Sequence, residues 1–178
     1  DENGKLTGHN TDGIGFVRNL QEHGVSVRGK KIVLLGAGGA ATAIAVQAAL
    51  DGAAEMAIFN RKDEFYPNAE CTVEKLHKAV PGCAASVRPL EDSEALAQAV
   101  KGCDILVNAT KVGMKPLDGQ SLIPVELLRK DLIVADTVYN PRKTQLILDA
   151  EKAGCKAAVG GIGMLLWQGV EAFHLFTG

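Results

Sequence analysis

The sequence of 178 residues predicts an α/β fold with a doubly wound parallel sheet in a single domain. Short apolar runs alternate with segments whose apolar residues recur at helical spacing, which is typical of strand–helix–strand units with right-handed crossovers. Residues 104–108, DILVN, have the unbroken apolar character of a strand buried on both faces. Residues 31–50 join such a strand to a glycine cluster and an alanine-rich helix. The chain length suits one well-buried domain.

The predicted elements follow one another in a regular order. Strands are expected at residues 31–35, 55–59, 84–87, 104–108, 132–136 and 156–159. Helices are expected from Asp12 to Gly24, after the first strand up to Asp51 and Gly52, at 73–79 with an irregular start near Pro67, at 93–100, from Pro141 to Gly154, and at 164–176. A proline at the first helical position and a glycine just past the end are the boundary signals used here. A long loop at 109–124 separates the fourth strand from the fifth.

The functional interpretation depends on the stretch 31–50, KIVLLGAGGAATAIAVQAAL. Gly36, Gly38 and Gly39 remove side chains that would keep a phosphate off the backbone, and the following helix directs free N–H groups and its positive dipole end there. The spacing is G-x-G-G-A, and Ala41 takes the third glycine position of the G-x-G-x-x-G fingerprint. Such a turn also occurs where a strand and a helix merely pack closely. We interpret it as a dinucleotide site in a Rossmann-like domain.

Composition argues against several classes of partner. The chain has 19 basic and 21 acidic residues and a net charge of -2, which gives no electrostatic case for nucleic acid or a membrane surface. No stretch is long and apolar enough to span a bilayer, so a cytoplasmic location is expected. The cysteines stand far apart, without a C-x-x-C pair or the histidine spacing of a metal site. We expect no bound metal and reduced, mostly buried thiols at Cys71, Cys83, Cys103 and Cys155.

Ligands of a doubly wound sheet collect at the carboxyl ends of its strands, and the loop after the second strand has an unusual composition there. Asn60, Arg61, Lys62 and Asp63 fall where an adenosine ribose would lie. Arg61 and Lys62 can pair with a 2′-phosphate, whereas Asp63 can accept hydrogen bonds from a free 2′-hydroxyl. The loop therefore permits NAD or NADP, and it is equally consistent with a solvated charged turn.

Three later loops complete the predicted crevice. After the fourth strand, Lys111, Gly113 and Lys115 can approach the nicotinamide half of a cofactor, although lysines are usually solvated. After the fifth strand, residues 137–141 offer Tyr139 and backbone carbonyls, and they are also expected to open the next helix. After the sixth strand, the glycines within 160–164 let the backbone pass close to a flat group. Gln168 follows one turn into the last helix, where a lone glutamine is usually exposed.

Asp12 is a candidate acid–base residue with a strong alternative explanation. An acid in the first turn of a helix is stabilised by the helix dipole, which alone accounts for it. Held near a substrate hydroxyl, the same carboxylate can share a proton during hydride transfer, provided that a partner group assists. The four histidines are scattered and the Gly-x-Ser-x-Gly elbow is absent, so the sequence does not support hydrolase chemistry.

An ordered set of motifs resembles the shikimate dehydrogenase family over nearly the whole chain. The motifs are NTDGxG at 10–15, GAGGA at 36–40, NR at 60–61, KVGM at 111–114, VYNP at 138–141 and GMLLWQG at 163–169. The second loop, NRKDEF, and the LLWQ segment are most similar to the quinate/shikimate dehydrogenase branch, which accepts both substrates and either nicotinamide cofactor. The NTD and MLLWQ segments disfavour a folate-linked dehydrogenase with a similar domain.

The resemblance implies a role for each matching position. Asp12 matches the catalytic aspartate, which binds a substrate hydroxyl and works with a lysine, and Thr11 and Gln168 match other substrate-binding residues. The implied cofactor-binding residues are Ala37, Gly38, Gly39 and Ala40 at the pyrophosphate, Asn60, Arg61, Lys62 and Asp63 at the adenosine ribose, Lys111, Thr137, Val138, Tyr139, Asn140 and Gly161 along the remaining length, and Met164 near the nicotinamide. The implied reaction is the NAD(P)-dependent reversible oxidation of shikimate or quinate to the 3-dehydro acids, in the shikimate pathway of aromatic amino acid biosynthesis.

The resemblance also implies a two-domain enzyme. Residues 1–178 would be its NAD(P)-binding domain, with residues 1–25 and 163–178 forming helices on the side of the other domain. Residues 1–5, DENGK, read as a turn between two strands, and the family's catalytic lysine and carboxylate-binding serines and threonine belong to an upstream domain. We therefore expect this piece alone to bind NAD(H) or NADP(H) weakly and to turn over neither shikimate nor quinate.

One residue departs from the family pattern, and one alternative function stays open. Gly160 stands where the family often has an acid, which affects the expected geometry of that loop. A non-catalytic dinucleotide-binding sensor or regulatory module is the alternative function, since it would keep the glycine turn without the reaction. Both a monomer and a homodimer are compatible with the sequence.

Overall fold

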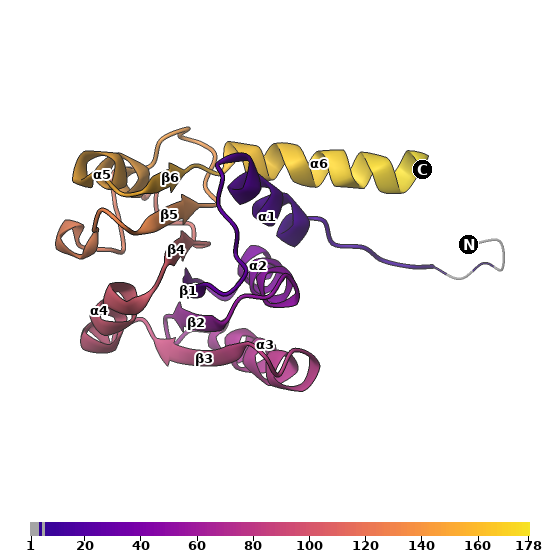
Figure 1. The fold of residues 1–178 in the computed structure, drawn as a ribbon, viewed down its shortest axis with the longest axis horizontal. Coiled ribbons are helices and arrows are strands. Elements are labelled where there is room, and N and C mark those ends of the chain that lie inside the picture. Colours follow the sequence, from indigo (N-terminus) through magenta and orange to yellow (C-terminus); the bar gives the residue numbers. More distant parts are fainter. Residues whose placement is uncertain (1–3, 5) are drawn as a thin grey trace.

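The computed structural model describes Gly4 and residues 6–178, so the turn expected at residues 1–5 lies outside the described residues except for Gly4. A six-stranded sheet forms the centre, in the order β3-β2-β1-β4-β5-β6 (Figure 1). All neighbouring strands pair in parallel. The strands are β1 Lys31–Leu35, β2 Glu55–Asn60, β3 Ala84–Pro89, β4 Ile105–Asn108, β5 Ile133–Asp136 and β6 Ala157–Val159. The chain winds outward from β1 in both directions, which confirms the predicted fold class.

Helices cover both faces of this sheet (Figure 1). In the described part of the chain they are α1 Asp12–Glu22, α2 Gly39–Leu50, α3 Tyr66–Ala79, α4 Ser93–Gly102, α5 Gln145–Ala153 and α6 Ile162–Thr177, with a short 3-10 helix η1 Val125–Leu127. Alternate residues of β1 face opposite layers. Ile32 and Leu34 share a core with α1, α2 and α3, whereas Val33 and Leu35 share one with α4 and α5. Burial on both faces explains why the strands read as continuous apolar runs.

Two helix starts differ from the sequence prediction. Helix α3 begins at Tyr66 rather than at residue 73, because Pro67 lies in the first turn, where its missing N–H breaks no helical bond. Helix α5 begins after Thr144 and not at Pro141. Thr144 is the N-cap, and its hydroxyl oxygen accepts a 3.4 Å hydrogen bond from the backbone amide three residues later. The start of α5 is therefore set by the N-cap Thr144 and not by Pro141.

The glycines predicted to end helices do so. Gly24 follows α1 with φ +71°, and Gly154 caps α5 with φ +72°, a left-handed conformation in which glycine has no steric penalty. Gly52, with φ +93°, follows α2 in the same way. The predicted helix ends after α1, α2 and α5 are confirmed.

Helix α1 lies between α2 and α6, with a glycine at each contact. A Cβ on Gly13 would collide with the carbonyl oxygen of Ala43 in α2. A Cβ on Gly15 would lie 2.6 Å from the backbone nitrogen of Gln168 in α6. These glycines let the three helix backbones approach one another directly, and they fix where the start of α1 lies relative to α6.

All four cysteines are free. Cys83 and Cys103 are buried and Cys155 is half-buried, in line with expectation, but Cys71 on α3 is exposed. Burial raises the pKa of the Cys103 thiol to about 11, so that thiol stays protonated and unreactive at neutral pH.

Candidate functional site

The turn after β1 is open at two of its glycines. Gly36 has φ +113°, and a Cβ there would lie 2.6 Å from the carbonyl oxygen of Ala109, so glycine is required. Apart from sequence neighbours and the backbone of α2 itself, no described residue has a heavy atom within 4 Å of a Cβ placed on Gly38 or Gly39. Gly38 is the N-cap of α2, and no side chain caps the first turn. An anion can therefore reach free N–H groups at the positive end of the helix dipole.

The neighbouring alanines of this turn differ in exposure. Ala37 is buried in the core that α1, α2 and α3 share, and Ala40 packs against that core from the first turn of α2. Only their backbones can therefore face a ligand in the turn. Such a surface, made of backbone and glycine, suits a pyrophosphate, because it offers N–H donors without obstructing side chains.

The loop after β2 is held in place by its own side chains. The buried Asn60 amide donates hydrogen bonds to the Arg61 carbonyl at 2.8 Å and to Asp63 Oδ1 at 2.9 Å. Asp63 Oδ1 also accepts a 3.0 Å bond from the Phe65 amide, and Asp63 Oδ2 lies 3.8 Å from Arg61 Nη2. Asp63 thus shapes the loop, whereas Arg61 and Lys62 are exposed and can reach a ligand. The predicted contacts of these residues with a ribose stay predictions.

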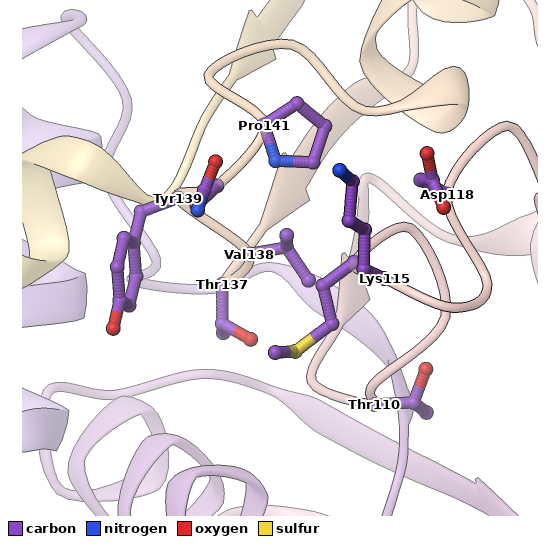
Figure 2. Close-up of a pocket in the computed structure, with 9 residues that line it drawn as sticks. Thr110, Lys115, Asp118, Thr137, Val138, Tyr139 and Pro141 are labelled. Atoms are coloured by element: carbon purple, nitrogen blue, oxygen red, sulfur yellow. The ribbon is translucent and has the colours of Figure 1, made fainter.

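A cleft of about 450 Å³ lies at the carboxyl ends of β4 and β5 (Figure 2). Its walls are the segment after β5 and the long loop after β4. In Figure 2, Thr137 and Val138 face Lys115 across the cleft, and Tyr139 extends away from Lys115. Thr137, Val138, Tyr139 and Asn140 of the predicted cofactor residues line this cleft. Lys111 is exposed and is not among the lining residues.

Of the two lysines expected in this loop, Lys115 lines the cleft. Sequence reasoning did not select four further lining residues as cofactor contacts, which are Thr110, Met114, Asp118 and Pro141. The loop after β4 was recognisable as part of the crevice because it follows a buried strand. Which of its side chains turn inward depends on irregular backbone, for which periodicity carries no signal.

A buried polar network centred on Asp136 lies next to the cleft. The Asp136 side chain is 1% exposed. Its Oδ1 accepts hydrogen bonds from Asn108 Nδ2 at 3.0 Å and the Val138 amide at 2.9 Å, and its Oδ2 accepts one from the Thr144 hydroxyl at 2.6 Å. Burial raises the pKa of the Asp136 carboxyl above its ordinary value, and the three hydrogen bonds oppose this rise. The only sequence signal for the network is an acid that ends the apolar run LIVAD.

Thr11, Asp12 and Gln168 gather where α1 crosses α6. The Thr11 hydroxyl donates a 3.4 Å hydrogen bond to Gln168 Oε1, although the two residues are 157 positions apart. Asp12 opens α1, and its backbone amide donates to Asn10 Oδ1 at 2.9 Å. Among the described residues, no hydrogen bond or ion pair engages the Asp12 carboxylate, which is half-buried. The structure thus brings the predicted substrate residues to one place and leaves a carboxylate there with free acceptor capacity.

The turn between β6 and α6 connects this crossing to the cleft. A Cβ on Gly161 would collide with the Thr137 carbonyl, and the Gly161 amide donates to the Val138 carbonyl at 3.2 Å. Met164, expected near a nicotinamide, is 7% exposed and packs in the core that includes α1. Most of its side chain therefore packs in the core beside the site. Its contact with a cofactor stays a prediction.

Gly4 and residues 6–178 contain neither a membrane-spanning helix nor a cluster of metal ligands. None of their helices has both the length and the apolarity that crossing a membrane requires. No three of their histidine, cysteine and acidic side chains are grouped so that they could hold a metal ion.

The strand order, the open glycine turn and the cleft at the carboxyl edge define a dinucleotide-binding domain of the Rossmann type. No protein-family model matches the chain. The chain is 51% identical over 178 residues to the shikimate dehydrogenase (NADP(+)) of Listeria monocytogenes serotype 4b (strain F2365). That match covers 99% of this chain and 60% of the relative. The chain is homologous to shikimate dehydrogenases and spans about 60% of their length.

Two solved structures extend the comparison. Shikimate 5-dehydrogenase from Listeria monocytogenes, in complex with shikimate and NAD, is 52% identical with a TM-score of 0.93, over 98% of this chain and 60% of that one. Quinate dehydrogenase from Corynebacterium glutamicum, in complex with NAD, is 31% identical with a TM-score of 0.86, over 100% of this chain and 60% of that one. The suspected family resemblance is confirmed at the level of both sequence and fold.

Proposed function

We propose that the chain is the nicotinamide-binding domain of a quinate/shikimate dehydrogenase, which oxidises shikimate or quinate reversibly to the 3-dehydro acid with NAD or NADP. The observation that carries the proposal is the open turn at Gly38 and Gly39, at the same edge of the sheet as the 450 Å³ cleft. Two homologues support the proposal. One is a shikimate dehydrogenase in complex with shikimate and NAD, and the other is a quinate dehydrogenase in complex with NAD.

The residues of the chain fit a nicotinamide dinucleotide from end to end. The backbone from Ala37 to Ala40 would hold the pyrophosphate, since two of its positions present no side chain. Asn60 to Asp63 would hold the adenosine ribose, with exposed Arg61 able to meet a 2′-phosphate. The cleft walls, residues 137–140, would hold the nicotinamide half. When bound, the cofactor supplies hydride transfer, and the protein supplies orientation and charge.

The crossing of α1 and α6 would meet the substrate. Thr11 and Gln168 are already in contact, and together they offer a hydroxyl and an amide to a polyhydroxylated ring. The Asp12 carboxylate, which no described residue engages, would accept the hydrogen bond of the reacting hydroxyl and share its proton as the hydroxyl becomes a carbonyl. A lysine from the remaining part of the enzyme would be its partner.

The domain assignment, location and assembly belong to the same proposal. Residues 1–178 would form one domain of a two-domain enzyme, with α1 and α6 on the side of the other domain. Four free cysteines support a reducing compartment such as the cytoplasm. A homodimer stays a prediction.

A substitution at Gly38 tests cofactor binding without disturbing the fold. Gly38 has φ -77° and ψ -175°, which any residue adopts, and a Cβ there meets no other part of the described chain. Gly38→Val should therefore fold normally but place its side chain where the pyrophosphate lies. We expect titration of the 178-residue chain with NADH and NADPH to show at least about tenfold weaker binding in this variant.

The matched control is Gly82→Val, in the turn before β3, where an added Cβ also meets nothing within 4 Å. It should bind both cofactors as the unchanged chain does. Equal binding by Gly38→Val would overturn the proposed cofactor site. Binding of cofactor by a full-length protein that oxidises neither shikimate nor quinate would favour the non-catalytic module instead.

A further inference from the structure

Asp136 is a fully buried carboxylate that no described cation accompanies. Its ring of partners consists of neutral donors, the Asn108 amide, the Val138 backbone and the Thr144 hydroxyl. Burying a charge without a counterion is costly, and donors that converge on both oxygens offset part of that cost. Since the side chain is 1% exposed, it cannot itself touch a ligand in the cleft. Its effect on the site must pass through the groups it binds.

The first partner leads into the loop after β4. Asn108 gives one N–H to Asp136 and the other to the Val112 carbonyl at 3.0 Å. Its Oδ1 accepts hydrogen bonds from the Thr110 amide at 3.2 Å and the Thr110 hydroxyl at 2.7 Å. Every polar atom of the Asn108 side chain is therefore used, and its orientation is fixed. Thr110, which lines the cleft, is held in place by this amide.

The other partners lead into the opposite wall. Val138 lines the cleft, and its amide is tied to Asp136 directly. Thr144 is the N-cap of α5, so its hydroxyl closes the loop from 137 to 143 back onto the strand end. Gly113 packs against Thr144, because a Cβ on Gly113 would lie 3.1 Å from Thr144 Cγ2. One carboxylate thus joins the two walls of the cleft to each other.

We propose that Asp136 is a positioning residue that sets the separation of the two cleft walls and thereby fixes the place of the nicotinamide half of the cofactor. This inference rests on the proposed function, since it assumes a dinucleotide in the cleft. The adenosine half would lie at the glycine turn and the loop after β2. Thr110 packs beside Gly36, but none of the described hydrogen bonds of the network reaches those segments. Loosening the network should therefore weaken the binding of the nicotinamide half and leave the binding of the adenosine half unchanged.

An aspartate suits this position better than an asparagine. Three donors converge on it, and only a carboxylate accepts at both oxygens without offering a hydrogen of its own. In Asp136→Asn, the amide oxygen can serve Val138 and Asn108, but the NH₂ group then faces the Thr144 hydroxyl, whose proton loses its acceptor. The variant keeps the shape of the side chain, but the Thr144 hydroxyl can now only accept from it, and the charge-assisted 2.6 Å bond that Thr144 donates is lost.

The test compares whole cofactors with their adenosine halves on the 178-residue chain. The variants are Asp136→Asn and Thr144→Val, the probes are NADH, NADPH, ADP and 2′-phospho-ADP, and dissociation constants are measured by calorimetry. We expect both variants to bind NADH and NADPH about tenfold more weakly, and ADP and 2′-phospho-ADP within about twofold of the unchanged chain. Thr144→Ser keeps the hydroxyl and should restore cofactor binding.

Two controls keep the outcome interpretable. Asp131→Asn removes an exposed carboxylate two residues before β5 begins, at the edge of the sheet away from the cleft. It should leave the dissociation constants of all four probes unchanged. Thr144→Val removes the same hydrogen bond from the other side, so the test still gives a result if Asp136→Asn fails to fold. Equal weakening of the adenosine halves and the whole cofactors would show a merely structural role and overturn the inference, as would unchanged cofactor binding. If the unchanged chain bound none of the four probes, the proposed function would fail instead.

Discussion

The cleft wall after β5 and the crossing of α1 with α6 are joined through Gly161, yet they treat their polar groups in opposite ways. At the wall, Asp136 is buried and each of its oxygens has a donor. At the crossing, the Asp12 carboxylate is half-buried and free among the described residues, and the Thr11–Gln168 bond is long at 3.4 Å. The saturated region can hold a ligand in one position, whereas the unsaturated region keeps capacity for a reacting group.

The contrast extends to apolar surface. The strands behind the cleft are completely buried, while α6 exposes several large apolar side chains, among them Phe173 and Phe176. The proposed nicotinamide side of the site is therefore built on residues that are buried and hydrogen-bonded within the described chain. The proposed substrate side presents exposed apolar groups and a half-buried carboxylate. Binding and chemistry should separate accordingly, and the following changes test that separation.

The largest effect is expected at Asp12. In the full-length enzyme, Asp12→Asn should lower kcat by about 100-fold or more, because it removes the group that shares the hydroxyl proton. The dissociation constants for NADH and NADPH should change by less than about twofold. Steady-state rates with shikimate and quinate, together with cofactor titrations, measure both quantities.

The matched control is Glu94→Gln, since Glu94 is also an acid in the first turn of a helix. It loses the same favourable interaction with a helix dipole but lies on α4, away from the site. Equal losses of turnover and cofactor affinity in Asp12→Asn would mean that Asp12 serves only the helix start, and the contrast between the two regions would disappear.

A change at the contact of α1 with α6 should have the next largest effect. Gly15→Ala places a methyl group 2.6 Å from the Gln168 backbone nitrogen and 2.8 Å from the Met164 carbonyl. The helices must separate, and we expect a loss of about 3 kcal/mol in the free energy of unfolding. Urea denaturation followed by circular dichroism measures it.

Gly169→Ala, in α6 itself, is the control, because an added Cβ there meets no described heavy atom within 4 Å outside its sequence neighbours and the backbone of its own helix. Alanine is the better helix former, so this variant should gain about 0.5–1 kcal/mol. A Gly15→Ala protein as stable as the unchanged chain would show that α1 and α6 are not locked together, and that the position of Gln168 relative to Thr11 is adjustable.

The smallest effect concerns the pH dependence of stability at the wall. Burial raises the pKa of the Asp136 carboxyl in the folded chain. An acid whose pKa is raised by folding holds its proton longer in the folded state, so its contribution to stability falls as pH rises through that pKa and recovers as pH is lowered. The difference between the unfolding free energies of the unchanged chain and of Asp136→Asn should therefore change in favour of the unchanged chain as the pH is lowered. A difference independent of pH, or one that shrinks on acidification, would contradict this.

The sequence was sufficient to predict the sheet because each strand is a continuous apolar run, and burial on both faces leaves few other arrangements. It also placed Gly36, Gly38 and Gly39 correctly, since a glycine turn has one dominant geometry. It could not reveal the link between Asp136, Asn108 and Thr144, which depends on the register of β4 and β5 and on the path of a loop. The sequence also could not reveal the packing role of the glycines of α1, because the residues that they contact lie in helices distant in sequence.

The glycine contacts of α1 have a mechanical consequence. With no side chains between them, the backbones of α1, α2 and α6 touch, so α1 has no layer of flexible atoms on which to slide. Helix α2 begins at the glycine turn and α1 begins at Asp12. If these are the proposed cofactor and substrate ends of the site, the direct backbone contacts would keep them at constant spacing when the domain moves.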